Sequence, residues 1–334
     1  MECKGKSRSI IQRLVYLLIL AVICGVIVVA STFGWRFWVR ENVMPKMKNK
    51  DLSANLEKHV FCLAHKIGDR TVFDYDKLRK AQAYIEKQFV SFGYSIESQN
   101  YNVYGKEVSN IIVTKRGVSK PEKIIIIGAH YDSCANPGAD DNASAVAGLL
   151  EIARILSNKQ TDKTIEFIAF VNEEPPFFRT ANMGSKVYAK AAKEKKEDIA
   201  AVIILEMIGY YSDKANSQKY PPFLGPFYPN KGNFIAVVGN FSCRWLVKKV
   251  VVLFKKATRF PVESLVTFEF VPGVDFSDHW SFWQEGYPAV MITDTAFYRN
   301  PNYHTLSDTY DTLDYHRMAE VISGMSIVLE RIAE

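Results

Sequence analysis

Side chains that could bind a metal ion follow three apolar runs of this sequence, each directly where the run ends. Such runs are typical of strands buried on both faces of a parallel sheet. The runs and the groups that follow them are residues 124–127 with His130, residues 164–171 with Glu173 and Glu174, and residues 200–205 with Glu206. Because parallel strands end at one edge of their sheet, we expect these side chains to meet there.

The first of these ends carries the densest group, with His130, Asp132, Asp140 and Asp141 in a loop before a helical run. One imidazole beside several carboxylates is a typical donor set for zinc. The histidine could equally be an ordinary buried polar residue, and Asp141 could cap the following helix. The other two strand ends favour the metal interpretation, because carboxylates crowded at an apolar edge repel one another and no Lys or Arg lies at these ends.

The remaining pattern alternates helices with strands and predicts an α/β fold. We expect a mostly parallel central sheet covered by helices on both faces. Beyond the three runs above, the expected strands are residues 94–103 and 108–115 as a pair, 234–238 and 289–293, and the expected helices are 56–67, 78–89, 143–156 and those beginning near 185, 242 and 314.

An uncharged apolar run of 22 residues at 14–35 precedes this part, with aromatic residues near its ends and basic residues on both sides. About 20 apolar residues suffice for a helix to cross a bilayer. We therefore expect one N-terminal transmembrane helix, a signal anchor, between a basic cytoplasmic tail at 1–13 and a connector at 36–50. The alternatives are a signal peptide cleaved near Ala30 and a buried core helix, against which the basic flanks argue.

The positive charge of the chain is concentrated at this N-terminal end. Of the net charge of +6 over 334 residues, residues 1–50 carry +7 and the rest carries −1. The globular part is therefore not basic, and we expect no nucleic-acid partner. A hydrophobic content of 48% fits one well-cored domain at 51–334. Five cysteines show no metal-type spacing and imply no disulfide framework, although one bridge is compatible with the sequence.

Several short motifs between residues 106 and 313 resemble those of the co-catalytic zinc exopeptidases. This family includes bacterial leucyl aminopeptidases, aminopeptidase Y and glutamate carboxypeptidase, and glutaminyl cyclases share its fold. The motifs, in order, are AHYDS at 129–133, PGADDNAS at 137–144, NEE at 172–174, LEMIG at 205–209, FSDH at 276–279 and NPNYHT at 300–305.

The resemblance implies two zinc ions per chain. His130 and Glu206 would bind the first, Glu174 and His304 would bind the second, and Asp141 would bridge both. In the family, the peptide bond that follows the bridging acid is often cis.

The resemblance also implies roles for residues around the metals. Glu173 would be the general base that takes a proton from a metal-bridging water and passes it to the leaving amine. Tyr303 would donate a hydrogen bond to the oxyanion, although it could equally serve packing. Asp132 would orient the imidazole of His130 from behind, and Asp278 would act similarly.

These inferences predict a membrane-anchored di-zinc aminopeptidase that hydrolyses the N-terminal peptide bond of peptide substrates. The protein would be a single-pass membrane protein with its N-terminus in the cytoplasm and its catalytic domain in the periplasm or outside the cell. The alternatives are a glutaminyl-cyclase-like acyltransferase with one zinc and a non-catalytic ectodomain of the same fold. The sequence indicates no oligomeric state.

Two segments could shape a substrate site, and each could equally serve core packing. Residues 175–178, PPFF, follow the glutamate pair as a stiff apolar wall. Residues 220–231 hold four prolines and four aromatic residues between two strands, and predict an ordered loop over the site.

Overall fold

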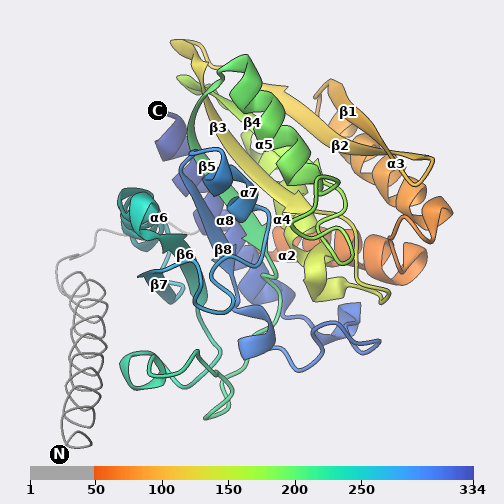
Figure 1. Ribbon diagram of the computed structural model, residues 1–334. Coiled ribbons are helices and arrows are strands. Elements are labelled where there is room, and N and C mark those ends of the chain that lie inside the picture. Colours follow the sequence, from red (N-terminus) through yellow and green to blue (C-terminus); the bar gives the residue numbers. More distant parts are fainter. Residues whose placement is uncertain (1–48) are drawn as a thin grey trace, which may run out of the picture.

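The computed structural model describes residues 49–334 (Figure 1). The expected cytoplasmic tail, the transmembrane helix at 14–35 and nearly all of the connector lie outside the described residues. Within residues 49–334, no helix is both long and apolar enough to cross a membrane.

The centre of the molecule is one eight-stranded sheet with the strand order β1-β2-β4-β3-β5-β8-β6-β7. Its strands are β1 Ile96–Val103, β2 Lys106–Lys115, β3 Lys120–His130, β4 Lys163–Phe170, β5 Asp198–Glu206, β6 Ile235–Asn240, β7 Val262–Thr267 and β8 Ala289–Thr293. The strands that the sequence predicted are all present. The described sheet also contains β7, which the sequence analysis did not predict.

The sheet is mixed, which corrects the expectation of a mostly parallel one. Strands β4, β3, β5 and β8 run parallel to one another, as do β6 and β7. The pairs β1–β2, β2–β4 and β6–β8 are antiparallel. The turn between β1 and β2 is too short for a crossover, so these strands can pair only as an antiparallel hairpin. The parallel centre of the sheet is the part that follows the prediction.

Helices cover both faces of the sheet, as expected. They are α2 Asn49–Val60, continued by the π-helical segment η1 Phe61–Ile67, α3 Tyr75–Ser91, α4 Ala145–Leu156, α5 Gly184–Lys195, α6 Arg244–Ala257, α7 His279–Gln284 and α8 Tyr315–Ala333. On one face, α2, α4, α6 and α8 pack against one another, and α3 packs against α4 and β2. On the other face, α5 and α7 pack together, in front of the sheet in Figure 1.

The carboxyl ends of the parallel strands lie level with one another. His130 of β3 is opposite Phe170 of β4, and Glu206 of β5 is opposite Thr293 of β8. The loops that follow these strands lie in the lower half of Figure 1. The fold therefore brings the three acidic or imidazole strand ends to one edge.

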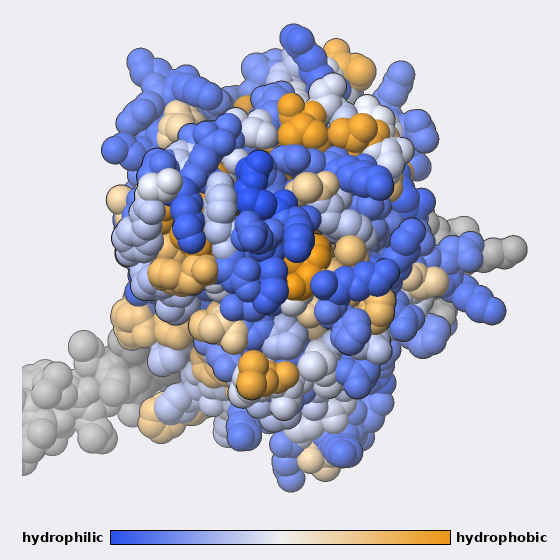
Figure 2. Space-filling view, turned by 90° about the vertical axis from the view of Figure 1, so that its right-hand side faces the viewer, coloured by the Kyte–Doolittle hydropathy of each residue, from blue (hydrophilic) through white to orange (hydrophobic). Residues whose placement is uncertain are grey.

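The surface in Figure 2 is mostly hydrophilic, and its apolar side chains form small separate patches. The large apolar side chains are instead concentrated around the sheet, where the second half of β3 and nearly all of β5 are buried.

Candidate active site

His130 ends β3 with its imidazole between two buried carboxylates. Its Nε2 lies 3.4 Å from Oδ1 of Asp141 and 3.4 Å from Oε2 of Glu206. Oε2 of Glu206 also accepts hydrogen bonds from Oγ of Ser277 at 2.7 Å and from Nδ2 of Asn142 at 3.2 Å. The histidine and the two acids form a group whose donor atoms all lie within 4.8 Å of one another.

His304 faces the other oxygen of Asp141. Its Nε2 lies 3.1 Å from Oδ2 of Asp141 and 3.2 Å from Oε2 of Glu174. His304 comes from the loop after β8 and adopts a positive φ of 55°. Asp141 is therefore shared, with one carboxylate oxygen facing each histidine.

Asp141 is held in this position from behind. It lies in the short segment η2, Ala139–Ser144, and the Asp141–Asn142 peptide bond is cis, as the resemblance implied. The carboxylate of Asp308 accepts hydrogen bonds from the backbone N–H groups of Asp140 and Asp141 at 2.9 and 3.1 Å. This contact fixes the main chain on which the shared acid is carried.

Asp140 is turned away from both histidines. Its Oδ1 accepts a hydrogen bond from the N–H of Gly209 at 2.9 Å, and its Oδ2 accepts one from Nδ2 of Asn300 at 2.7 Å. Burial, followed by the charge of Asp294, raises its pKa well above the usual range. Asp140 thus has structural partners, which agrees with the assignment of the shared position to Asp141.

Glu173 and Asp132 lie beside His130 on opposite sides of its ring. Oε2 of Glu173 is 3.8 Å from Nε2 of His130, and Oδ1 of Asp132 is 3.5 Å from Nδ1. The two oxygens of Asp132 accept the backbone N–H groups of Glu173 and Glu174 at 3.1 and 3.0 Å. Asp132 therefore contacts the imidazole and holds the main chain of both glutamates.

Within residues 49–334, neither Arg179 nor Asp278 forms an ion pair with Glu173. Arg179, its nearest basic residue in sequence, forms an ion pair with Asp275 instead. Asp278 is fully buried at the start of α7. Burial raises its pKa to about 7, against the opposing charge of His130. Within residues 49–334, Asp278 makes no ion pair with His130, so it acts on that histidine only over a longer range than Asp132 does.

The electrostatics of the cluster favour added positive charge. Burial is the largest influence on the pKa of its acids, and raises that of Glu174 to about 8 and that of Glu173 well above its usual range. Burial acts in the opposite direction on His130 and His304, but the neighbouring carboxylates outweigh it and raise both pKa values, that of His304 to about 12. A divalent cation supplies the charge that these shifts indicate is missing.

The donor set fits such a cation. Within the described chain, four acids of the cluster form ion pairs with histidine and none with Lys or Arg. They are Asp141, Glu173, Glu174 and Glu206. Oε1 of Glu174 is buried and has no hydrogen-bond partner among these residues. A buried carboxylate oxygen without a partner is costly, so the site is built for a group that satisfies it. Imidazole nitrogens and carboxylate oxygens are typical ligands of catalytic zinc.

A cavity of about 370 Å³ opens beside this cluster and is lined mainly by apolar side chains. Tyr303 lines it and stacks on the ring of His304, with 3.8 Å between the ring centroids. Phe178 lines the cavity, whereas Phe177 is buried and stacks on Phe73. The loop at 220–231 contributes four further lining residues, which are Tyr220, Pro221, Leu224 and Tyr228. One residue of the expected wall therefore packs in the core, while the loop borders the cavity as expected.

Sequence reasoning missed several residues that support the site. Asp308 follows His304 by only four residues, a spacing that could have drawn attention to it. Arg70 lies 59 residues before the first motif, which begins at 129, and carried no signal. Cys134 was passed over because the cysteines show no metal-type spacing. It is a free thiol, as are Cys62 and Cys243.

The fold and the cluster of imidazoles and carboxylates indicate a metal-dependent hydrolase. The comparisons with known proteins indicate the same class. The model of Peptidase family M28 matches residues 110–328. The chain therefore belongs to this peptidase family, and the prediction of a metallo-exopeptidase, a hydrolase, is confirmed at the level of the family.

Among curated relatives, the chain is 41% identical over 302 residues to YfbL of Escherichia coli K12, which is named only as an uncharacterized protein. That match covers 87% of this chain and 91% of YfbL. Other relatives are named as aminopeptidases or zinc metalloproteases, and the chain spans 24% to 57% of their length.

Solved structures show the same fold. A zinc aminopeptidase from Bacillus subtilis aligns with a TM-score of 0.69 and 16% identity, over 84% of this chain and 95% of its own. A glutaminyl cyclase from Bacteroides thetaiotaomicron aligns with a TM-score of 0.63 and 21% identity, over 86% of this chain and 99% of its own. At these identities the likeness establishes the fold alone.

Proposed function

We propose that the protein is a membrane-anchored aminopeptidase that binds two zinc ions. The observation that carries this proposal is the shared carboxylate of Asp141, which offers one oxygen toward His130 and the other toward His304. A carboxylate between two imidazoles, each with its own glutamate, is a donor set for two adjacent cations rather than one.

In this proposal, His130 and Glu206 would hold one zinc ion, Glu174 and His304 would hold the other, and Asp141 would be shared by both. Bound zinc would polarise the scissile carbonyl and lower the pKa of a water molecule. Asp132 keeps the imidazole of His130 and the main chain of both glutamates in place.

Glu173 is the proposed general base. It lies beside the cluster and has no Arg or Lys partner within residues 49–334, and burial raises the pKa of its carboxylate. A raised pKa makes it a better proton acceptor near neutral pH. Glu173 would take a proton from the attacking water and deliver it to the leaving amine. Tyr303, at the cavity wall, would donate its hydroxyl proton in a hydrogen bond to the developing oxyanion.

The apolar cavity suits the side chain of an N-terminal residue. Phe178 and Leu224 line it from segments that are far apart in the sequence, together with Met291 from β8. An apolar side chain buried there contributes roughly 25 cal/mol per Å² of surface removed from water. The proposed substrates are therefore peptides with an apolar N-terminal residue.

The test is the substitution Glu173→Gln, assayed on a panel of amino-acid anilides. We expect kcat to fall by about 10² to 10⁴ while elemental analysis still finds two zinc ions per chain. Glu166→Gln, on a half-buried glutamate of β4, the strand that leads to Glu173, is the control and should retain turnover. Full activity of Glu173→Gln would refute the mechanism.

Glutaminyl cyclisation is the second candidate, because the chain spans 99% of a glutaminyl cyclase with the same fold. It predicts one zinc ion per chain and turnover of peptides with N-terminal glutamine. Two zinc ions and hydrolysis of anilides would exclude it.

The membrane anchor is proposed from the apolar run at 14–35 and its basic flanks. The full chain should remain in the membrane pellet after extraction at alkaline pH, and protease added outside the cytoplasmic membrane should digest the catalytic domain. Release of the intact chain by alkaline extraction would contradict the anchor.

A further inference from the structure

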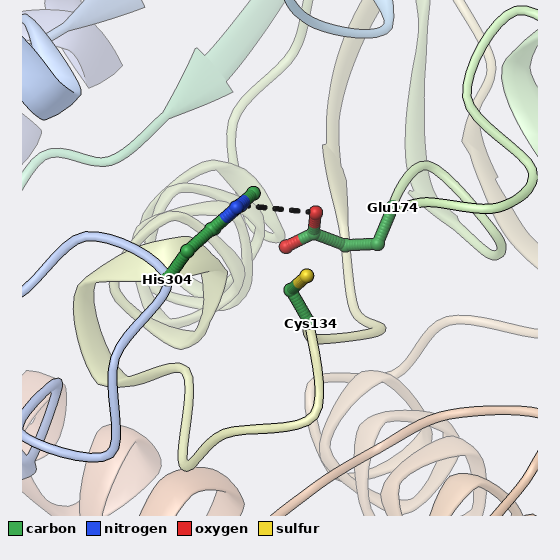
Figure 3. A group of neighbouring side chains, drawn as sticks. All are labelled: Cys134, Glu174 and His304. Atoms are coloured by element: carbon green, nitrogen blue, oxygen red, sulfur yellow. Dashed lines mark ion pairs between the residues drawn. The ribbon is translucent and has the colours of Figure 1, made fainter.

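Cys134 lies in the loop between β3 and η2, next to the second half of the proposed metal site. Its Sγ, a carboxylate oxygen of Glu174 and a ring nitrogen of His304 all lie within 4.8 Å of one another. Figure 3 shows the three side chains extending from separate segments toward a common space.

A second observation indicates that this space is meant to hold a ligand. Glu174 is 4% exposed, and its Oε1 is buried without a hydrogen-bond partner among residues 49–334. Its other oxygen, Oε2, faces His304 at 3.2 Å. Glu174, which carries the unpartnered oxygen, and the thiol thus belong to the same small group. A cation among them would satisfy both.

We propose that Cys134 is a further protein ligand of the metal ion held by Glu174, His304 and Asp141. The inference rests on the proposed metal site and extends it by one sulfur donor. The thiol proton would leave to solvent as the metal binds.

The added donor has a consequence for metal choice. Two carboxylates and one imidazole accept zinc, manganese and cobalt alike, whereas a thiolate favours zinc over the harder manganese and magnesium ions. Cys134 would therefore make this half of the site selective for zinc. Loss of an outer contact to a metal ligand typically costs about 10- to 100-fold in affinity, so loss of a direct donor should cost at least about tenfold.

The other described cysteines provide matched controls. Cys62 is half-buried like Cys134 and lies in η1, whereas Cys243 is buried between β6 and α6. Among the described residues, neither belongs to a group of three donors that could hold a metal. Cys62→Ser therefore removes a thiol of similar exposure without touching the site.

The experiment is reconstitution of the metal-free full chain with Co²⁺, followed by absorption spectroscopy. We expect a thiolate-to-cobalt charge-transfer band in the wild type and in Cys62→Ser, and its loss in Cys134→Ser. We also expect Cys134→Ser to bind zinc at one site at least about tenfold more weakly than the wild type. A band that persists in Cys134→Ser, or cobalt binding by the wild type without a band, would overturn the inference and leave the proposed function standing. Failure of the wild type to bind cobalt or zinc would overturn both.

A second measurement needs no variant. Alkylation of the wild type by iodoacetamide, followed by mass spectrometry, gives separate rates for Cys134 and Cys62. Zinc should slow alkylation of Cys134 and leave that of Cys62 unchanged. Equal alkylation rates of Cys134 with and without zinc would contradict the proposal that Cys134 binds the metal ion.

Discussion

Arg70 shows how one residue can fix a loop that contains none of its sequence neighbours. Its side chain is fully buried and donates hydrogen bonds to five backbone carbonyls. Three of these acceptors, Tyr131, Pro137 and Gly138, lie in the loop between His130 and Asp141. The planar guanidinium therefore fixes the backbone of the loop that separates the candidate ligands His130 and Asp141.

We expect Arg70→Lys to destabilise the protein by about 3 kcal/mol, because lysine has three donors instead of five and leaves buried carbonyls without partners. The free energy of unfolding in urea measures this change, and kcat/KM should fall with it. Arg331→Lys, on the exposed end of α8, is the control and should change stability by less than about 0.5 kcal/mol. Equal stabilities of the two variants would show that Arg70 does not fix this loop.

Among individual residues, the sequence predicted those that follow strand ends. It missed those whose role depends on contacts between distant segments of the chain. His130, Glu174 and Glu206 could be grouped because each follows a buried strand. His304 needed the resemblance, since it ends no strand, and so did the choice of Asp141 over Asp140 as the shared acid. The contacts of Arg70 and Cys134 join segments that no periodicity relates, so neither could be foreseen.

The junction of β4 and α5 shows how one helix is placed against the site. The N–H of Gly184, the first residue of α5, donates to the carbonyl of Val171 at 2.8 Å. Asn110 of β2 links the same two residues, because its Nδ2 donates to the carbonyl of Gly184 and its Oδ1 accepts the N–H of Val171. Val171 lies two residues before Glu173, so this contact positions the proposed base.

We expect Gly184→Ala to destabilise the protein by about 1 to 3 kcal/mol and to lower kcat. An added Cβ would overlap the carbonyl oxygen of Val171 and the side-chain oxygen of Asn110, neither of which can move freely. Thermal unfolding and anilide hydrolysis measure the two effects. A Cβ at Gly225 meets nothing closer than 4.0 Å, so the stability of Gly225→Ala should stay within about 0.5 kcal/mol of the wild type. A neutral Gly184→Ala would contradict the proposed tight junction.

Glu151 joins two helices of the opposite face. On its own helix α4, it accepts a hydrogen bond from Arg154 at 2.7 Å. From α2, Nδ2 of Asn55 donates a hydrogen bond to it at 3.2 Å, and Nε2 of His59 lies 3.5 Å away. Burial alone would raise the pKa of Glu151, but the hydrogen bonds from His59 and Arg154 outweigh it and lower the pKa from 4.5 to about 2. The carboxylate therefore stabilises the fold above pH 4.5, and this contribution is lost as the pH falls from 4.5 to about 2.

Glu151→Gln should therefore cost about 2 kcal/mol at pH 7, after allowance for solvent screening at the partly exposed Arg154. The difference from the wild type should shrink as the pH falls below 4.5 and vanish near pH 2. Urea unfolding at several pH values measures it. Glu330→Gln, on a partly exposed ion pair with Lys159, should show little difference at any pH. A gap between wild type and Glu151→Gln that does not change with pH would contradict this role.

Elements were predicted well where apolar runs are long and less well where they are not. Residues 124–127 and 200–205 could be assigned to the parallel centre because their side chains are buried on both faces. Strand β7 was missed because it carries Glu263 and Ser264 at partly exposed positions. The direction of β6 was also beyond the sequence, since an apolar strand of six residues fits a parallel or an antiparallel neighbour equally well.

At the scale of the whole molecule, the site joins parts of the chain that are otherwise separate. The ligand candidates follow β3, β4 and β5 or lie in η2 and in the loop after β8, and Asp308 ties that loop back to η2. A cation bound there would contact the native arrangement and not the unfolded chain. Its binding free energy would therefore add to the stability of the entire fold.

Chelation should consequently lower the stability of the whole protein. With free zinc about 1,000-fold above Kd, the metal-loaded chain should be more stable than the metal-free chain by about 4 kcal/mol. The midpoint of urea unfolding, measured with zinc and with a chelator, reports this difference. Asp141→Ala removes the acid shared by both histidines, so its midpoint should respond much less to zinc. Identical midpoints for the wild type in zinc and in chelator would mean that these acids and imidazoles hold no metal, and the proposed chemistry would fail with them.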